Sequence, residues 1–158
     1  MKIDVIVVGK TKGALLITSD EYTKMISKYA DISIIEIKEE RLPLRASEAQ
    51  IENALNKEAE AILKRIGERD FVYAMSPEGV EFNSMMFSGQ LRNAFDLGQS
   101  KVVFIIGSSH GLGNEVYKRA NLKLSFSKMT FPHQLFRVML LEQIFRAFKI
   151  MNNETYHK

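Results

Sequence analysis

The feature that most constrains this chain is a regular alternation of short apolar stretches with helical patterns. Five such stretches read as strands, at residues 3–8, 31–37, 71–75, 101–106 and 122–126. Between them, apolar side chains recur at spacings of three and four, which is typical of amphipathic helices; one such set is Tyr22, Met25, Ile26 and Tyr29. Continuous apolar strands joined by helices predict an α/β fold with a mainly parallel sheet and helices on both faces.

Local signals predict where these elements begin and end. The first helix is expected to begin at Thr18-Ser19-Asp20, because short polar side chains cap helix N-termini. The third strand is expected to end at Ser76, where Pro77 and Gly79 follow closely. The next helix is expected over residues 84–97, with Gly98 as its stop, and the last over residues 134–151.

Length and composition limit the architecture and the compartment. A chain of 158 residues, 46% hydrophobic and 26% charged, fits one domain over residues 1–158. The absence of cysteine excludes disulfides and is consistent with a cytoplasmic protein. No apolar run approaches the length of a membrane span, so no membrane partner is expected. A net charge of +3 permits a nucleic-acid partner but is not a strong basic signal.

Three strand ends are the expected location of a ligand site. Parallel α/β sheets bind ligands beyond the carboxyl ends of their strands. In this chain those ends are Met75-Ser76, Gly107-Ser108 and Phe126-Ser127. The segment after the last of them, FSKMTFPHQ, leads directly into the final helix.

Known nucleotide and metal motifs do not match. In the loop at residues 107–113, Val116 stands where the third glycine of a G-x-G-x-x-G fingerprint belongs, and the chain has no Walker Gly-Lys pair there. The loop is therefore either a tight turn or a place where backbone approaches a ligand. The three histidines lie on separate elements without metal-site spacing, so no metal is expected.

The final helix is apolar over most of its circumference, which indicates burial on more than one side. Its second side is covered either by other elements of the same chain or by a second subunit, and we expect a homodimer, because two-fold dimers are the commonest oligomers. Arg137 interrupts the apolar surface one turn into this helix. It either forms a structural salt bridge or holds a phosphate or carboxylate. His133, near the helix start, either meets a substrate or faces solvent.

Taken together, three segments resemble the RlmH family of bacterial large-subunit rRNA methyltransferases. They are FIIGSSHGL at 104–112, LSFSKMTFPHQLFRVMLLEQIFRAFKI at 124–150 and YHK at 156–158. The resemblance extends over essentially the whole chain. It implies the α/β-knot, or SPOUT, fold with a C-terminal trefoil knot. It also implies a homodimer that uses S-adenosylmethionine to methylate N3 of a pseudouridine in helix 69 of 23S rRNA.

The same resemblance implies which residues form the site. The cofactor-binding residues are expected to be Met75, Gly107, Phe126, Ser127, Lys128, Met129, Thr130 and Phe131. The substrate-side candidates, with the general base unassigned, are His133, Arg137, Tyr156, His157 and Lys158. Two positions depart from the family pattern: Ser108 replaces a second glycine, and Ser76 replaces an acidic residue. Ser108 is expected to crowd the cofactor if its backbone needs a positive φ.

Other functions stay open on the sequence alone. A SPOUT enzyme of this kind is also compatible with another rRNA base or a tRNA base as its target. A non-catalytic ribosome-associated protein that has lost the cofactor is the alternative that Ser108 favours. A nicotinamide-dependent oxidoreductase is disfavoured because the glycine fingerprint fails.

Overall fold

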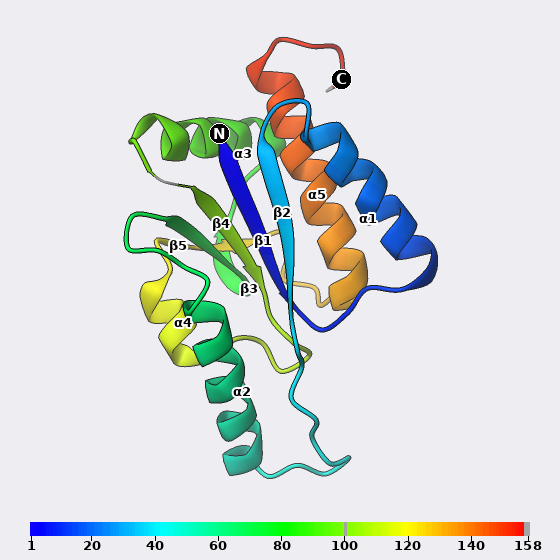
Figure 1. The fold of residues 1–158 in the computed structure, drawn as a ribbon, viewed down its shortest axis with the longest axis vertical. Helices are drawn as coiled ribbons and strands as arrows, with labels where there is room; N and C mark the ends of the chain where they lie inside the picture. The colour runs from blue at the N-terminus through cyan, green and yellow to red at the C-terminus, as the bar shows by residue number, and fades with distance from the viewer. Residues whose placement is uncertain (100, 157–158) are drawn as a thin grey trace.

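The computed structural model describes residues 1–99 and 101–156 and contains a five-stranded parallel sheet between two layers of helices (Figure 1). The strands are β1 (Lys2–Val8), β2 (Asp31–Ile37), β3 (Phe71–Glu81), β4 (Val102–Ile106) and β5 (Leu122–Ser125). Their order across the sheet is β2-β1-β4-β3-β5, and every neighbouring pair is parallel. The predicted α/β class is confirmed.

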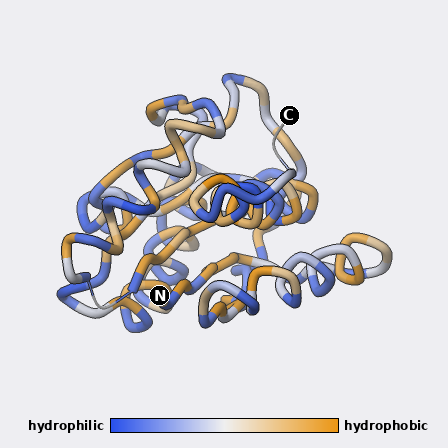
Figure 2. Tube along the Cα trace, turned by 90° about the horizontal axis from the view of Figure 1, so that it is seen from above, coloured by the Kyte–Doolittle hydropathy of each residue, from blue (hydrophilic) through white to orange (hydrophobic). Residues whose placement is uncertain are grey.

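Five helices cover the two faces of this sheet: α1 (Gly13–Ile26), α2 (Glu48–Leu63), α3 (Ser84–Asp96), α4 (Asn114–Arg119) and α5 (His133–Met151). The first face packs against α1, α3 and α5, and the second against α2 and α4. Along β1, Val5 and Val7 point into the first layer, whereas Ile6 and Val8 point into the second. Figure 2, seen from above, shows hydrophobic strands between helices of mixed hydropathy. Burial on both faces explains why the central strands are mostly apolar. Asp4 of β1 is a buried polar exception that pairs with Lys101, and the edge strand β2 carries exposed polar residues.

The first helix begins earlier than predicted. The expected start at Thr18-Ser19-Asp20 is wrong, because α1 begins at Gly13 with Lys12 in the N-cap position. Ser19 instead lies inside the helix, fully buried, where its hydroxyl accepts a hydrogen bond of 2.9 Å from Nε of Arg137. Ser19 is therefore explained by its hydrogen bond to Arg137 of α5, and not by the helix-capping role that its residue type suggested.

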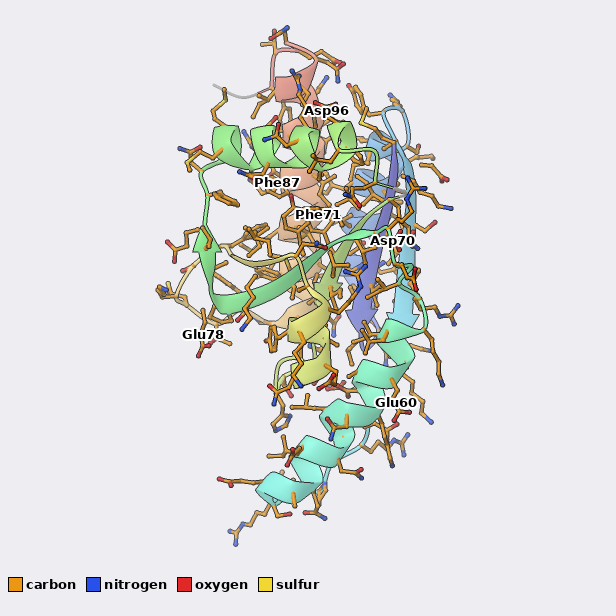
Figure 3. All side chains as sticks on the ribbon, turned by 90° about the vertical axis from the view of Figure 1, so that its left-hand side faces the viewer. Glu60, Asp70, Phe71, Glu78, Phe87 and Asp96 are labelled. Carbon is orange, nitrogen blue, oxygen red and sulfur yellow. The ribbon has the colours of Figure 1, made fainter. Side chains whose placement is uncertain are left out.

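The third strand continues past its predicted end. Met75 and Val80 both pair with Leu124 of β5, so residues 76–79 form a bulge inside β3. Gly79 is needed at this bulge, because a Cβ there would lie 2.6 Å from the carbonyl of Lys123. Glu78, on the same bulge, is exposed and points away from the sheet (Figure 3). β3 continues beyond Pro77-Glu78-Gly79 because it pairs with β5 on both sides of the bulge. No local sequence signal indicates this long-range pairing.

The final helix, α5, lies between α1 and α3 in its layer and packs on the sheet. Its inward side is buried, with Leu140, Leu141 and Ile144 fully so. Its outward apolar residues, among them Val138 and Met139, are only partly buried. One chain therefore covers several sides of α5 but leaves one apolar side partly open. Within the part of the chain that the structure describes, no helix is long and apolar enough to cross a membrane.

Candidate active site

A cavity of about 240 Å³ lies at the carboxyl end of the sheet, where the sequence predicts a ligand site. Residues 75–77 of the β3 bulge form one wall, and residues 106–109 after β4 form the second. The third wall is the segment that leaves β5 and enters α5. The three predicted segments therefore meet around one space, because β3 lies between β4 and β5 in the sheet, although the first of them is a bulge within β3 and not its end.

The loop after β4 is a tight turn that also lines the cavity. The N–H of Gly111 donates to the carbonyl of Ser108 at 2.9 Å, and Gly111 has a φ of +89°. A Cβ on Gly107 would lie 2.2 Å from the carbonyl oxygen of Gly111, so only glycine fits there. The sequence left open whether this loop is a turn or a ligand loop. It forms a turn and also lines the cavity, so the two interpretations do not exclude each other.

Ser108 sits in this loop without backbone strain. Among the described residues other than glycine, only Asn153 has a positive φ, so Ser108 does not require the conformation that its β-carbon would disfavour. The carboxylate of Glu58 on α2, which lines another hollow together with Ser108, accepts a hydrogen bond from the N–H of Glu40 at 2.9 Å. Burial raises the pKa of Glu58, and the Glu40 N–H and the Ser108 hydroxyl oppose that rise only in part. Ser108 therefore lies between the cavity and this hollow, whose remaining walls are α2 and the loop after β2.

The segment between β5 and α5 is shaped by its own hydrogen bonds and by aromatic packing. The Ser125 hydroxyl donates to the carbonyl of Ser127 at 3.0 Å, and the Ser127 hydroxyl accepts from the N–H of Met129 at 3.0 Å. Phe136 of α5 contacts two phenylalanines of the segment, with ring centroids 5.1 Å from Phe126 and 6.3 Å from Phe131. The turn is thereby held against the start of α5 with its apolar side toward the cavity.

His133 stands at the border of the cavity. It is the first residue of α5, half-buried, and it lines both this cavity and a neighbouring groove. A Cβ on Gly9, at the end of β1, would lie 3.2 Å from Nε2 of His133 and 3.4 Å from Oε2 of Glu39. The imidazole is therefore packed over the backbone of Gly9, with Glu39 close by.

Arg137, by contrast, points into the protein. Its side chain is 4% exposed. Nε donates to Ser19, and Nη1 donates to Oγ1 of Thr11 at 3.1 Å and to Oε1 of Glu36 at 3.0 Å. This is the structural salt bridge that the sequence left as one of two interpretations. It joins α5 to α1, to the loop after β1 and to β2.

Tyr156 of the C-terminal tail lies far from the cavity of its own chain. Its ring packs edge-on against Phe145 with centroids 5.0 Å apart, and its hydroxyl donates to Glu142 at 3.3 Å. Because a helix rises about 1.5 Å per residue, Phe145 stands about 18 Å from His133 along α5. Partial burial raises the pKa of Tyr156 to about 12, so this phenol is not a base at neutral pH. His157 and Lys158 lie outside the described residues.

Comparison with known proteins decides the family. The family described as Predicted SPOUT methyltransferase matches residues 1–157. The chain belongs to the SPOUT methyltransferase family. A Clostridium perfringens relative named ribosomal RNA large subunit methyltransferase H 1 is 50% identical over the full length of both chains. A Clostridium botulinum relative named ribosomal RNA large subunit methyltransferase H is 49% identical with the same coverage.

A solved structure supports the same fold at low sequence identity. It is that of a probable methylase family protein from Haemophilus influenzae, with a TM-score of 0.53 and 15% identity, covering 99% of this chain and 70% of that one. The family resemblance drawn from the sequence and the SPOUT fold class are confirmed. The predicted C-terminal knot is a property of this family's fold.

Most residues predicted to bind the cofactor line the cavity at the carboxyl end of the sheet. The seven that line it are Met75, Gly107, Phe126, Ser127, Met129, Thr130 and Phe131. Lys128 is exposed and does not line the cavity. Residues that bind the same ligand must line the same cavity, and these seven do. That they bind the cofactor stays a prediction. Across residues 1–99 and 101–156, no three His, Asp or Glu side chains are grouped so as to hold a metal ion.

Several lining residues were missed by sequence reasoning. Ile106, Leu124 and Ser125 are direct neighbours of the predicted strand ends, so a wider window around each end would have included them. Tyr117 of α4 and Phe136 of α5 are different, because they reach the cavity only through the packing of helices. No motif or spacing marks those two.

Proposed function

We propose that this chain is an S-adenosylmethionine-dependent methyltransferase that modifies N3 of a pseudouridine in helix 69 of 23S rRNA. The observation that carries the proposal is the single cavity lined by seven of the eight residues that the family resemblance assigns to the cofactor. Membership in the SPOUT family and half-identical relatives named as large-subunit rRNA methyltransferases support it. An rRNA substrate makes the cytoplasm its place of action.

The cavity residues fit the adenosine part of this cofactor. Apolar side chains such as Met75, Ile106 and Leu124 suit the flat faces of a purine. The backbone groups of residues 107–109 and the hydroxyls of Ser127 and Thr130 are available for its polar edges. When bound, S-adenosylmethionine supplies an electrophilic methyl group, and this chemistry needs neither a metal nor a covalent link to the protein.

On the substrate side, the chain must hold the target base and let its N3 proton leave. Holding two reacting groups in line supplies several kcal/mol of a reaction barrier. We assign substrate contact to His133, because its side chain lines both the cavity and the groove beside it. The proton acceptor stays unassigned among the substrate-side candidates.

Arg137 has a different role in this proposal. Direct contact with RNA would require the guanidinium to leave Ser19, Thr11 and Glu36, at the cost of several charge-assisted hydrogen bonds. We propose that Arg137 positions the start of α5, and with it His133, relative to the loop after β1. It is then a positioning residue rather than a catalytic one.

The homodimer is part of the proposal. A groove of about 640 Å³ lies along the outward side of α5 and is lined by apolar residues including Tyr22, Phe82, Val138 and Met139. Phe126 lines both this groove and the cofactor cavity, so a second copy seated on the groove would lie next to the cavity. Since Tyr156 is distant from its own cavity, its tail would serve the partner's. Light scattering should show a dimer, and Met139→Glu should yield monomers that do not methylate.

Mass spectrometry of 23S rRNA from a deletion strain tests the target. We expect the loss of one methyl group on the helix-69 pseudouridine and its return on complementation; persistence of that methyl group would overturn the assignment. Loss of a methyl group elsewhere would instead indicate a SPOUT enzyme for another base. Calorimetry with S-adenosylmethionine tests the cofactor, because an absence of binding would favour the non-catalytic alternative.

A further inference from the structure

A second hollow of about 510 Å³ lies beside the cofactor cavity, at the carboxyl ends of β1 and β2. One wall is the loop after β1, which carries Lys10 and Lys12, and the other is the loop after β2, which carries Lys38 and Arg41. Both loops lie at the same end of the sheet as the start of α5 (Figure 1). We name this hollow, defined by these four cations, the basic groove. His133 forms the border that it shares with the cavity.

The four cations of the basic groove have free charges. All four residues are exposed. Over residues 1–99 and 101–156, none of them forms an ion pair with a carboxylate. The groove also contains Glu36 and Glu39, but the Glu36 carboxylate is already held by Arg137 at 3.0 Å. Positive charge therefore dominates, although the whole chain carries only +3.

Two helix starts add to this positive potential. The N-caps of α1 and α5 are Lys12 and Pro132, and neither helix start has a side-chain cap within the described part of the chain. The N–H of Lys12 donates to Oε1 of Gln134 at 3.2 Å, which holds the two starts next to each other. Backbone N–H groups at a helix N-terminus favour anions, so both helices strengthen the field of the four side chains.

We propose that the basic groove binds the phosphate backbone of the RNA strand whose target base enters the cofactor cavity past His133. This inference rests on the proposed function and names the surface that positions its substrate. Phosphate contacts from lysine and arginine fix the register of a protein on a nucleic acid without reading its sequence. A strand bound along the groove would present its next bases to the cavity, because His133 borders both spaces.

The test compares two charge-matched double variants. Lys12→Gln with Lys38→Gln removes two cations from the basic groove. Lys24→Gln with Lys28→Gln removes two exposed cations at and beyond the opposite end of α1. Methylation of ribosomes is measured at several salt concentrations, binding of a labelled rRNA hairpin by anisotropy, and S-adenosylmethionine affinity by calorimetry.

For the groove variant we expect kcat/KM on ribosomes to fall about tenfold, and the slope of log affinity against log salt to fall by about two for the hairpin. Its affinity for S-adenosylmethionine should equal that of the unaltered protein, and the control variant should behave as the unaltered protein does. Equal behaviour of the two variants would overturn the groove while leaving the proposed function intact.

Failure of the proposed function looks different. If the unaltered protein neither binds S-adenosylmethionine nor methylates RNA, the proposed function fails, and hairpin binding still tests the groove: weaker binding by the groove variant alone supports it. A loss seen only with ribosomes, with unchanged hairpin binding, would mean that the cations contact ribosomal protein. That result would overturn the assignment to RNA phosphate.

Discussion

The two ends of the sheet differ in whether their charged side chains have partners. At the amino end, Lys101 before β4 forms an ion pair with Asp4 of β1 and lies 3.6 Å from Asp70, which is labelled at the start of β3 in Figure 3. Nearby, Nη2 of Arg119 donates to the carbonyls of Gly67 and Asp70 at 2.7 and 3.0 Å. The charged side chains of this cluster are therefore satisfied by other groups of the same chain.

The carboxyl end keeps charges without partners. Within the described residues, the cations of the basic groove form no ion pair with a carboxylate, and the buried carboxylate of Glu58 forms none with a cation. Some charges at this end do have partners: Lys57 pairs with Glu40 at 3.9 Å, and the buried Arg137 donates three hydrogen bonds. The difference indicates that the amino end contributes stability, whereas the unpaired charges of the carboxyl end suit the ligand binding that we propose for it.

Lys101→Ala removes the cation at the amino end and should cause the largest loss of stability. It leaves Asp4 and Asp70 buried without their cation, which should lower the free energy of unfolding by about 3–5 kcal/mol. Burial, the largest single influence, lowers the pKa of Lys101, but the two aspartates together outweigh it and raise the pKa. The stabilisation is therefore complete below the ordinary lysine pKa and disappears as the pH rises through the raised one.

Urea unfolding measures this loss, with Lys64→Ala, an exposed lysine after α2, as the control. Methylation by the Lys101 variant should persist at temperatures where it stays folded. A loss no larger than that of the control would show that the amino end is not the stabilising end.

Arg137→Ala tests the one buried cation at the carboxyl end. Removing its bonds to Ser19, Thr11 and Glu36 should cost about 2–4 kcal/mol of stability, less than at Lys101 because the Glu36 side chain is 34% exposed and regains water. Well below the unfolding temperature, kcat should fall while the KM for RNA is kept, and Arg137→Lys should recover part of kcat. A rise in KM with a smaller salt dependence would mean that Arg137 touches RNA, contrary to the positioning role.

Gly107→Ala changes the cavity wall without changing charge. The new methyl group would clash with the Gly111 carbonyl, so the loop must shift, at a cost of about 1–3 kcal/mol. We expect weaker binding of S-adenosylmethionine in calorimetry. The matched control is Gly89→Ala on α3, where a Cβ meets no atom within 4 Å and should stabilise the helix by about 0.5–1 kcal/mol. Unchanged cofactor affinity in the Gly107 variant would exclude this loop from the binding site.

Glu58→Gln should have the smallest effect and the opposite sign. Because the folded protein holds the pKa of Glu58 above its ordinary value, ionisation weakens the fold, and stability falls as the pH rises from that ordinary value through the raised one. The glutamine keeps an acceptor for the Glu40 N–H but cannot ionise, so the variant should gain stability at neutral pH and lose this pH dependence. Urea unfolding across the acidic range measures both, and Glu60→Gln, exposed on the same helix (Figure 3), is the control. A pH dependence equal to that of the control would contradict the prediction.

Much of the fold could be predicted because it depends on patterns within single segments. Strands buried on both faces are mostly apolar, so their positions and the parallel α/β class follow from the sequence. The predicted start of α1 and the predicted end of β3 failed for a shared reason. Ser19 has its partner on α5, and the β3 bulge follows β5, so each boundary depends on a distant segment.

The sequence by itself determined the five strands, the family and the three segments, including FSKMTFPHQ, around which the cavity forms, although β3 continues beyond its predicted end. Only the tertiary structure decided three further points. Arg137 is buried. Tyr156 packs against Phe145, which lies about 18 Å along α5 from His133. Lys12 and Gln134, 122 residues apart, border one groove. The physical reason is the sequence separation over which each kind of interaction acts. Strand and helix patterns act over a few neighbouring residues, whereas charge pairing and cavity walls join segments that only the folded sheet brings together.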